Sequence, residues 1–172
     1  GPARWGVYLR KTSGEPAVRL GDGQAFALSP DGKMALTRSL GTPPEVVLLP
    51  TGAGEPIRIR NDDITNFEAT DRMPDRQPFV FSGSESGQGV RSYIQGIDGG
   101  EPRPITPEGY RFWLGQKAVS PTGKWLAAET NGAPSLFPIE GGEEREIPGV
   151  EPGDEFVAWS TDGRSIFLAA GS

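Results

Sequence analysis

Residues 27–36, ALSPDGKMAL, place a Ser-Pro-Asp-Gly-Lys turn between two short apolar runs. Proline sets φ for the second position of such a turn, aspartate caps it with its own side chain, and glycine supplies positive φ. Related turns stand at Ser120–Lys124 and Ser160–Arg164, and a copy without glycine stands at Met73–Arg76. With starts at 29, 73, 120 and 160, the copies lie 44, 47 and 40 residues apart. This spacing indicates an internal repeat.

A second marker, Gly-Glu-Pro, alternates with the first. It starts at Gly14, Gly54 and Gly100, and a weaker copy starts at Gly142, so its spacings are 40, 46 and 42 residues. Apolar runs flank both markers, which gives four short strands in each repeat. No segment keeps a helical apolar period for more than about two turns. The sequence therefore predicts an all-β fold, a β-propeller of about four blades, each a four-stranded antiparallel sheet.

The order of the markers sets the expected blade boundaries. We expect an outer half-blade at 5–24, whole blades at 25–68, 69–114 and 115–155, and an inner half-blade at 156–172. The two halves could pair within one chain and close a four-bladed ring, or the arc could be part of a larger ring. We expect instead a homodimer that completes an eight-bladed ring, because an open arc exposes apolar blade sides. The sequence alone leaves these alternatives open.

Composition excludes several classes of function. The chain contains no histidine and no cysteine, so it cannot form a Ser-His-Asp triad, a cysteine nucleophile or a zinc site built on imidazole and thiolate. Its net charge is −6 and its basic residues are scattered, which argues against a nucleic-acid partner. No apolar run approaches the roughly 20 residues that span a bilayer, so this segment should not insert in a membrane. We expect no cofactor, no metal site and no catalysis, since no carboxylate pair stands out as a glycosidase centre.

The residues at 27–36 resemble the repeat of TolB-like propellers, and Ile97–Thr106 resembles the turn into the outer strand of that repeat. The resemblance extends over about residues 5–170 and includes propeller segments fused to bacterial serine/threonine kinases or winged-helix regulators. It implies a binding, scaffold or sensor module of a larger bacterial protein, in a periplasmic or extracytoplasmic location. The alternative is an accessory propeller of a serine peptidase-type hydrolase. Gly1-Pro2 is typical of a tag-removal scar, so we expect the chain to be part of a longer protein.

In such a propeller, the loops from each outer strand to the next inner strand gather on one face. Here they are about residues 61–67, 107–113 and 149–156. Aromatic residues and arginine are enriched at binding hot spots. Packing between blades is the competing role for Phe112 and Trp113. We predict a site for a protein partner or a small ligand made of Asp63, Phe67, Tyr110, Arg111, Trp113 and Phe156. The acidic stretch 61–75 lacks the spacing of a calcium loop and is expected to be solvated.

Overall fold

The computed structural model describes residues 5–29, 31–59, 61–72, 78–131 and 133–170. Within them the chain forms fifteen strands and no helix, so nothing in this part is a helix that could cross a membrane. The prediction of an all-β fold built from antiparallel sheets is confirmed. The turn copy at Met73–Arg76 lies outside the described residues.

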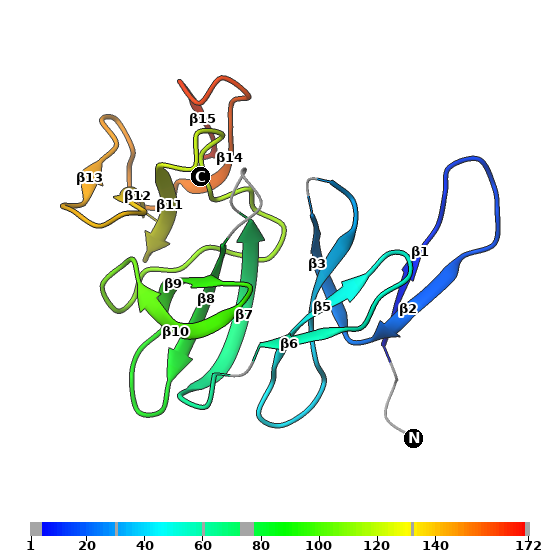
Figure 1. The fold of residues 1–172 in the computed structure, drawn as a ribbon. Coiled ribbons are helices and arrows are strands. Elements are labelled where there is room, and N and C mark those ends of the chain that lie inside the picture. The colour runs from blue at the N-terminus through cyan, green and yellow to red at the C-terminus, as the bar shows by residue number, and fades with distance from the viewer. Residues whose placement is uncertain (1–4, 30, 60, 73–77, 132, 171–172) are drawn as a thin grey trace.

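Two complete four-stranded sheets form the centre of the molecule, and their strands pair in chain order. The first contains β3 (Gln24–Leu28), β4 (Met34–Arg38), β5 (Val46–Pro50) and β6 (Ile57–Ile59). The second contains β7 (Ile64–Arg72), β8 (Phe79–Glu85), β9 (Arg91–Gly96) and β10 (Gly99–Pro104). Figure 1 shows these sheets side by side, with one edge of each sheet turned toward the same central space.

A third sheet follows, made of β11 (Trp125–Thr130), β12 (Ala133–Pro138) and the short β13 (Arg145–Glu146). The segment 117–119 adds an inner edge to it, because Val119 bridges Leu126 and the Ala127 amide donates to the Ala118 carbonyl at 2.9 Å. Each end of the chain adds a two-stranded sheet. These are β1 (Gly6–Leu9) with β2 (Val18–Asp22), and β14 (Glu155–Trp159) with β15 (Ile166–Ala169).

The recurring turn owes its shape to its serine and aspartate. Ser29 Oγ donates to Asp31 Oδ1 at 2.7 Å, and the Met34 amide donates back to Ser29 Oγ at 2.7 Å. Ser160, Asp162 and Ser165 repeat these bonds in the last copy. There the hydroxyl of Ser160 holds the pKa of the Asp162 carboxyl below its ordinary value. These local bonds explain why the sequence closes a hairpin at Ser29 and again at Ser160.

Among the described residues, the core lies between the sheets in three separate clusters. Alternate residues of one strand face opposite neighbours: Val46 and Leu48 of β5 pack toward β7 and β8, whereas Val47 and Leu49 pack toward β1. β8 behaves in the same way, with Phe79 and Phe81 facing one neighbouring sheet and Val80 the other. A strand buried on both faces reads as a continuous apolar run, which explains the Val-Val-Leu-Leu sequence of β5.

Polar bonds join each sheet to the next. Arg38 of β4 donates to the Phe67 carbonyl of β7 at 2.6 Å, and Arg103 of β10 donates to the Ile139 carbonyl after β12 at 2.7 Å. Asp71 of β7 accepts from the Val119 amide at 3.0 Å. These bonds satisfy buried backbone groups and fix the angle between neighbouring sheets.

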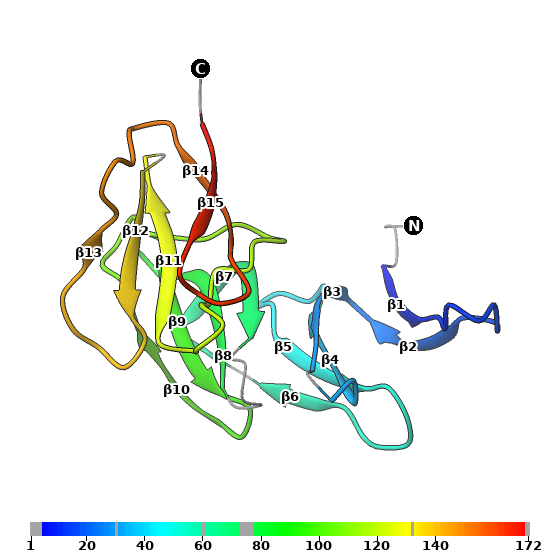
Figure 2. The same ribbon diagram turned by 90° about the horizontal axis from the view of Figure 1, so that it is seen from above.

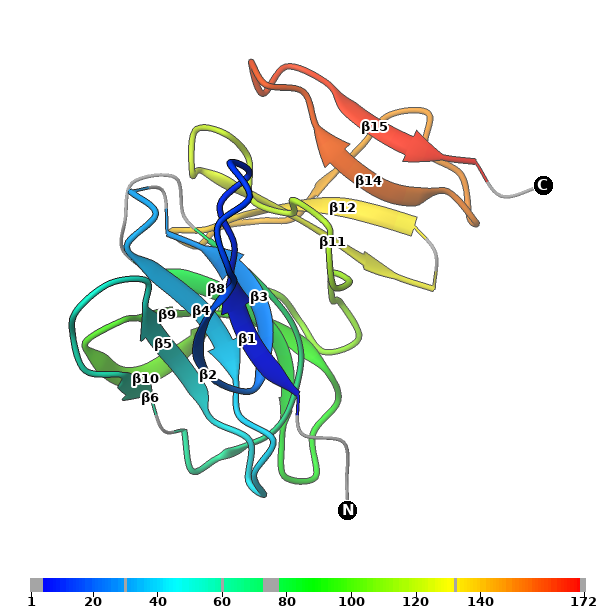
Figure 3. The same cartoon turned by 90° about the vertical axis from the view of Figure 1, so that its right-hand side faces the viewer.

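The sheets follow one another round an open arc. Figure 2 shows the β1–β2 pair at one end of the arc and the β14–β15 pair at the other, and Figure 3 views the molecule from the β1–β2 side. Within the described residues, β1 pairs only with β2 and β15 only with β14. The two half-blades therefore do not join within the chain as the structure stands.

Candidate functional site

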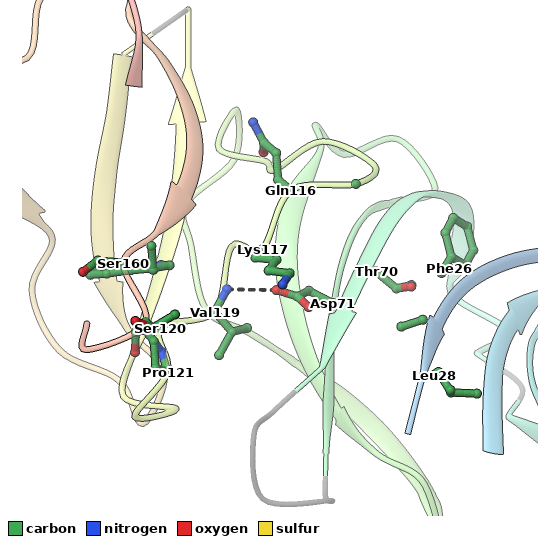
Figure 4. A pocket seen from close by; sticks show the side chains of 14 residues that line it. Phe26, Leu28, Thr70, Asp71, Gln116, Lys117, Val119, Ser120, Pro121 and Ser160 are labelled. Atoms are coloured by element: carbon green, nitrogen blue, oxygen red, sulfur yellow. Dashed lines mark hydrogen bonds between the residues drawn. The ribbon is translucent and has the colours of Figure 1, made fainter. Parts of the chain in front are cut away.

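The inner edges of four sheets surround a cavity of about 570 Å³, called here the channel cavity (Figure 4). Its walls come from β3, β7, the segment 115–121 and the end of β14 with the turn that follows it. The lining residues include Phe26, Leu28, Thr70, Asp71, Lys117, Val119, Trp159 and Ser160. Lys117 bridges Ala158 in parallel, so the inner edges of the last two sheets meet beside this cavity.

Polar groups lie on the wall of the channel cavity among apolar ones. Asp71 holds the Val119 amide, and the indole of Trp159 donates to the Ala118 carbonyl at 2.9 Å. Thr70 is only 5% exposed, and its hydroxyl has no hydrogen-bond partner in the described part of the chain. This oxygen is closed off from solvent, so the hydroxyl is a buried polar group whose hydrogen bond is not satisfied.

A second hollow, called here the loop cleft, has a volume of about 750 Å³ and lies beside the loop 113–117. Trp113, Leu114, Glu129, Glu155, Phe156 and Val157 line it, together with Gly115 and Gln116. Gly115 and Gln116 also line the channel cavity, so the two hollows share this loop as a common wall. Polar and apolar groups contribute about equally to the lining of the loop cleft.

Hydrogen bonds and an ion pair fix the position of Trp113 at the loop cleft. The guanidinium of Arg111 lies 4.3 Å from the centre of the Trp113 ring and bonds Glu68 of β7 at 3.1 Å. The indole nitrogen donates to Glu129 of β11, which also accepts from the Phe156 amide at 3.4 Å. Three sheets therefore hold one tryptophan, whose side chain is nevertheless 46% exposed. The ring is therefore exposed but held in one orientation.

Comparisons with known proteins place this arrangement in a known architecture. No protein-family model and no curated protein matches the chain. Among solved structures, it is similar to a putative TolB from Agrobacterium tumefaciens (TM-score 0.67, 22% identity, over 90% of this chain and 57% of that one). It is also similar to TolB from Acinetobacter baumannii (TM-score 0.68, 18% identity, over 95% of this chain and 42% of that one).

The chain has the fold of a TolB-like β-propeller. The fold that the sequence resemblance implied is thereby confirmed. The chain spans about half the length of the two TolB proteins, so the arc seen here corresponds to part of their length.

Two of the six predicted site residues of this TolB-like propeller belong to the core, and their prediction as surface contacts is wrong. Phe67 is fully buried, since β7 begins at Ile64 and includes a residue expected in the preceding loop. Its ring lies 4.8 Å from that of Phe81. Phe156 is 2% exposed, and its ring packs edge-on against Trp159 in β14. In both cases an apolar ring at an inner position of a strand gains more from burial than from a place on the surface.

The other four residues remain candidates, in different settings. Arg111 and Trp113 stack together at the loop cleft, as described above. Tyr110 is half-buried against Phe137 and donates to Glu144 at 3.0 Å; burial first, and then this carboxylate, raise the pKa of its hydroxyl. Asp63 is exposed in the turn before β7, and within the described residues no hydrogen bond or ion pair joins it to the other three. Phe112 is fully buried, in agreement with the competing packing role.

The structure adds Glu68, Gln116 and Glu129 to the site, none of which the sequence analysis selected. Gln116 accepts from the Trp113 amide at 2.7 Å and donates to the Phe156 carbonyl, so it ties the loop to β14. Glu129 had a signal in the sequence, because it is a lone carboxylate at the end of the apolar run Leu126–Ala128. For Glu68 and Gln116 only the folded arrangement shows a place in the site.

Proposed function

We propose that this TolB-like propeller is a non-catalytic binding or scaffold module of a larger protein, and that it holds a segment of a protein partner in the loop cleft. One observation carries the proposal. Trp113, Leu114 and Val157, which are 46%, 49% and 47% exposed, gather around a single hollow. Grouped exposed apolar side chains mark interaction sites, whereas isolated ones do not.

The rigidity of the loop cleft favours binding. Arg111, Gln116 and Glu129 hold the tryptophan in place, so a partner would lose little free energy in ordering it. Apolar rim residues suit the side chains of a peptide segment, and the adjoining channel cavity offers the polar side chains of Lys117 and Ser160. A sensor role is part of the same proposal, because a partner bound at the shared loop 113–117 would contact both hollows.

Two of the carboxylates near the loop cleft already hold neighbouring residues, which fits the binding role proposed here. Glu129 accepts from Trp113 and Phe156, and Glu68 accepts from Arg111 and Asn66. Each of these two groups is engaged in holding neighbouring residues. Among the described residues no group of three or more acidic side chains is arranged to hold a metal ion.

A peptide library tests the proposal, because the partner is unidentified. Random peptides displayed on phage are selected on the chain, and their affinities are measured by interferometry. We expect selected peptides to bind Trp113→Ala at least about tenfold more weakly, which corresponds to about 1.4 kcal/mol.

Trp5→Ala is the matched control, since Trp5 is 63% exposed and outside the loop cleft. Peptides should bind this variant as they bind the unchanged chain. The proposal is wrong if both tryptophan variants bind equally well, or if no peptide is enriched.

A further inference from the structure

We propose that the partner segment held in the loop cleft carries a lysine or arginine, whose cation faces the carboxylates of Glu129 and Glu155 while an apolar part of the segment packs on Trp113. This inference rests on the function proposed above and adds the chemistry of the partner. The two carboxylates and the tryptophan line the same hollow, so one short segment can reach all three.

Glu129 is a buried negative charge without a cation beside it. It lies in β11 at the wall of the loop cleft and is 6% exposed. Its oxygens accept from the Trp113 indole and the Phe156 amide, which are both neutral donors. In the part of the chain that the structure describes, Glu129 makes no ion pair. A buried carboxylate is costly unless an opposite charge compensates it, so a cation that enters the cleft gains free energy from Glu129.

Glu155 adds a second negative charge to the loop cleft. It is the first residue of β14, and its side chain is exposed. Within the described residues its carboxylate takes part in no hydrogen bond or ion pair. The amide of the next residue, Phe156, donates to Glu129, so the bond brings the start of β14 to the end of β11. The carboxylate of Glu155 is therefore available to a partner at the same cleft.

The described lining of the loop cleft contains these two carboxylates and no basic side chain. Arg111 is nearby, but its guanidinium already bonds Glu68 at 3.1 Å and stacks on the Trp113 ring. Lys117 lines the channel cavity and not the loop cleft. Complementary charge across an interface favours one partner over another, and here it favours a basic segment over an acidic one.

The apolar side of the loop cleft suits the same residue types. Trp113 and Leu114 are 46% and 49% exposed at its rim. Lysine and arginine have hydrocarbon stems that lie along apolar surface while the charged head reaches a polar group. A ring that is exposed beside two carboxylates can therefore hold both parts of such a side chain.

Two random peptide libraries displayed on phage test the charge of the partner. Lysine and arginine are the only charged residues in one library, and aspartate and glutamate are the only charged residues in the other. A selected peptide is assigned to the loop cleft when it binds Trp113→Ala at least about tenfold more weakly and binds Trp5→Ala as it binds the unchanged chain. We expect such peptides from the basic library only. Replacing their basic residues by glutamine should weaken binding at least about tenfold.

Glutamine variants of the chain test the two carboxylates. The basic peptides should bind Glu155→Gln at least about threefold more weakly, as for an exposed ion pair. Glu55→Gln is the matched control and should bind them unchanged, since Glu55 is also exposed, lies outside the loop cleft and loses the same charge. Glu129→Gln keeps an oxygen for the indole and should weaken binding at least about tenfold. Circular dichroism checks that this buried substitution leaves the fold intact.

The possible outcomes separate this inference from the function proposed above. Peptides from the acidic library that bind the loop cleft as tightly as the basic ones would overturn the inference and leave the proposed function standing. Equal losses in Glu155→Gln and Glu55→Gln would also overturn it, because the attraction would then come from the overall charge of the chain. So would unchanged binding to both Glu155→Gln and a folded Glu129→Gln. If neither library yields a peptide that depends on Trp113, the proposed function is refuted and the inference with it.

Discussion

At the scale of single residues, Phe67 and Asp63 illustrate what the sequence could and could not predict about the site. Both were expected in one loop, but β7 starts at Ile64 and separates them. The pattern of β7, ITNFEATDR, does not alternate cleanly between apolar and polar residues. Which of its residues are buried is decided by packing against the neighbouring sheets, and the sequence of the strand does not show this. By contrast, Arg111 and Trp113 were selected from residue type alone, because binding sites favour such side chains, and they stay candidates for binding.

Because Phe67 is buried and Asp63 is exposed, alanine substitution should change the free energy of unfolding much more at Phe67 than at Asp63. Phe67→Ala should lower the free energy of unfolding by about 3–5 kcal/mol, since it empties a fully buried aromatic position. Asp63→Ala should change it by less than about 0.5 kcal/mol, as an exposed turn residue. Urea unfolding followed by fluorescence measures both. A small effect of Phe67→Ala would place that residue back among the candidates for binding.

At the scale of strands and turns, the sequence was most informative where the chemistry is local. The Ser-Pro-Asp-Gly-Lys turn makes its own hydrogen bonds, so its copies mark hairpins without help from the rest of the chain. The blade boundaries drawn from these copies stay a prediction. Links between elements were not predictable, because partners such as Arg38 and the Phe67 carbonyl lie far apart in the sequence.

One such link joins the turn before β7 to β9. Asn61 and Gln95 are buried and exchange two amide hydrogen bonds, and Gln95 also donates to the Gly100 carbonyl at 2.7 Å. Gln95→Met should destabilise the fold by about 1–3 kcal/mol, because it leaves the Asn61 amide buried without a partner. Asn61→Ala should lower the free energy of unfolding less in the Gln95→Met background than in the unchanged chain. The difference, which is the coupling energy of the two side chains, should be at least about 0.5 kcal/mol.

The matched control for this cycle is Gln88→Met, which removes an exposed amide that bonds Glu85. Its effect should stay within about 0.5 kcal/mol. Chemical denaturation of the four variants gives all the free energies. Strict additivity of the Asn61 and Gln95 substitutions would show that the two side chains do not act together.

At the scale of the whole molecule, stability should be organised by neighbouring sheets, because each core cluster lies between two of them. Ile139→Val and Ile59→Val each remove one methylene group, but from different core clusters. Ile139 is fully buried and Ile59 is 2% exposed. Each should cost about 0.5–1.5 kcal/mol. Hydrogen exchange should quicken most in β11–β13 for the first variant and in β3–β6 for the second. The same exchange pattern in both variants would mean that the arc unfolds only as one unit.

The separation of the three core clusters also bears on how such a chain can change in length. In the part of the chain that the structure describes, each cluster stays between its two adjacent sheets. A duplicated or deleted stretch of about 40–47 residues would therefore bring its own hairpins and meet interfaces of the kind already present. The recurring markers of this sequence have the form that such duplication leaves. Gain or loss of a whole repeat would alter the width of the central space while leaving the packing inside every other sheet as it was. The number of sheets in this architecture is therefore open to variation in a way that the sequence of a single sheet is not.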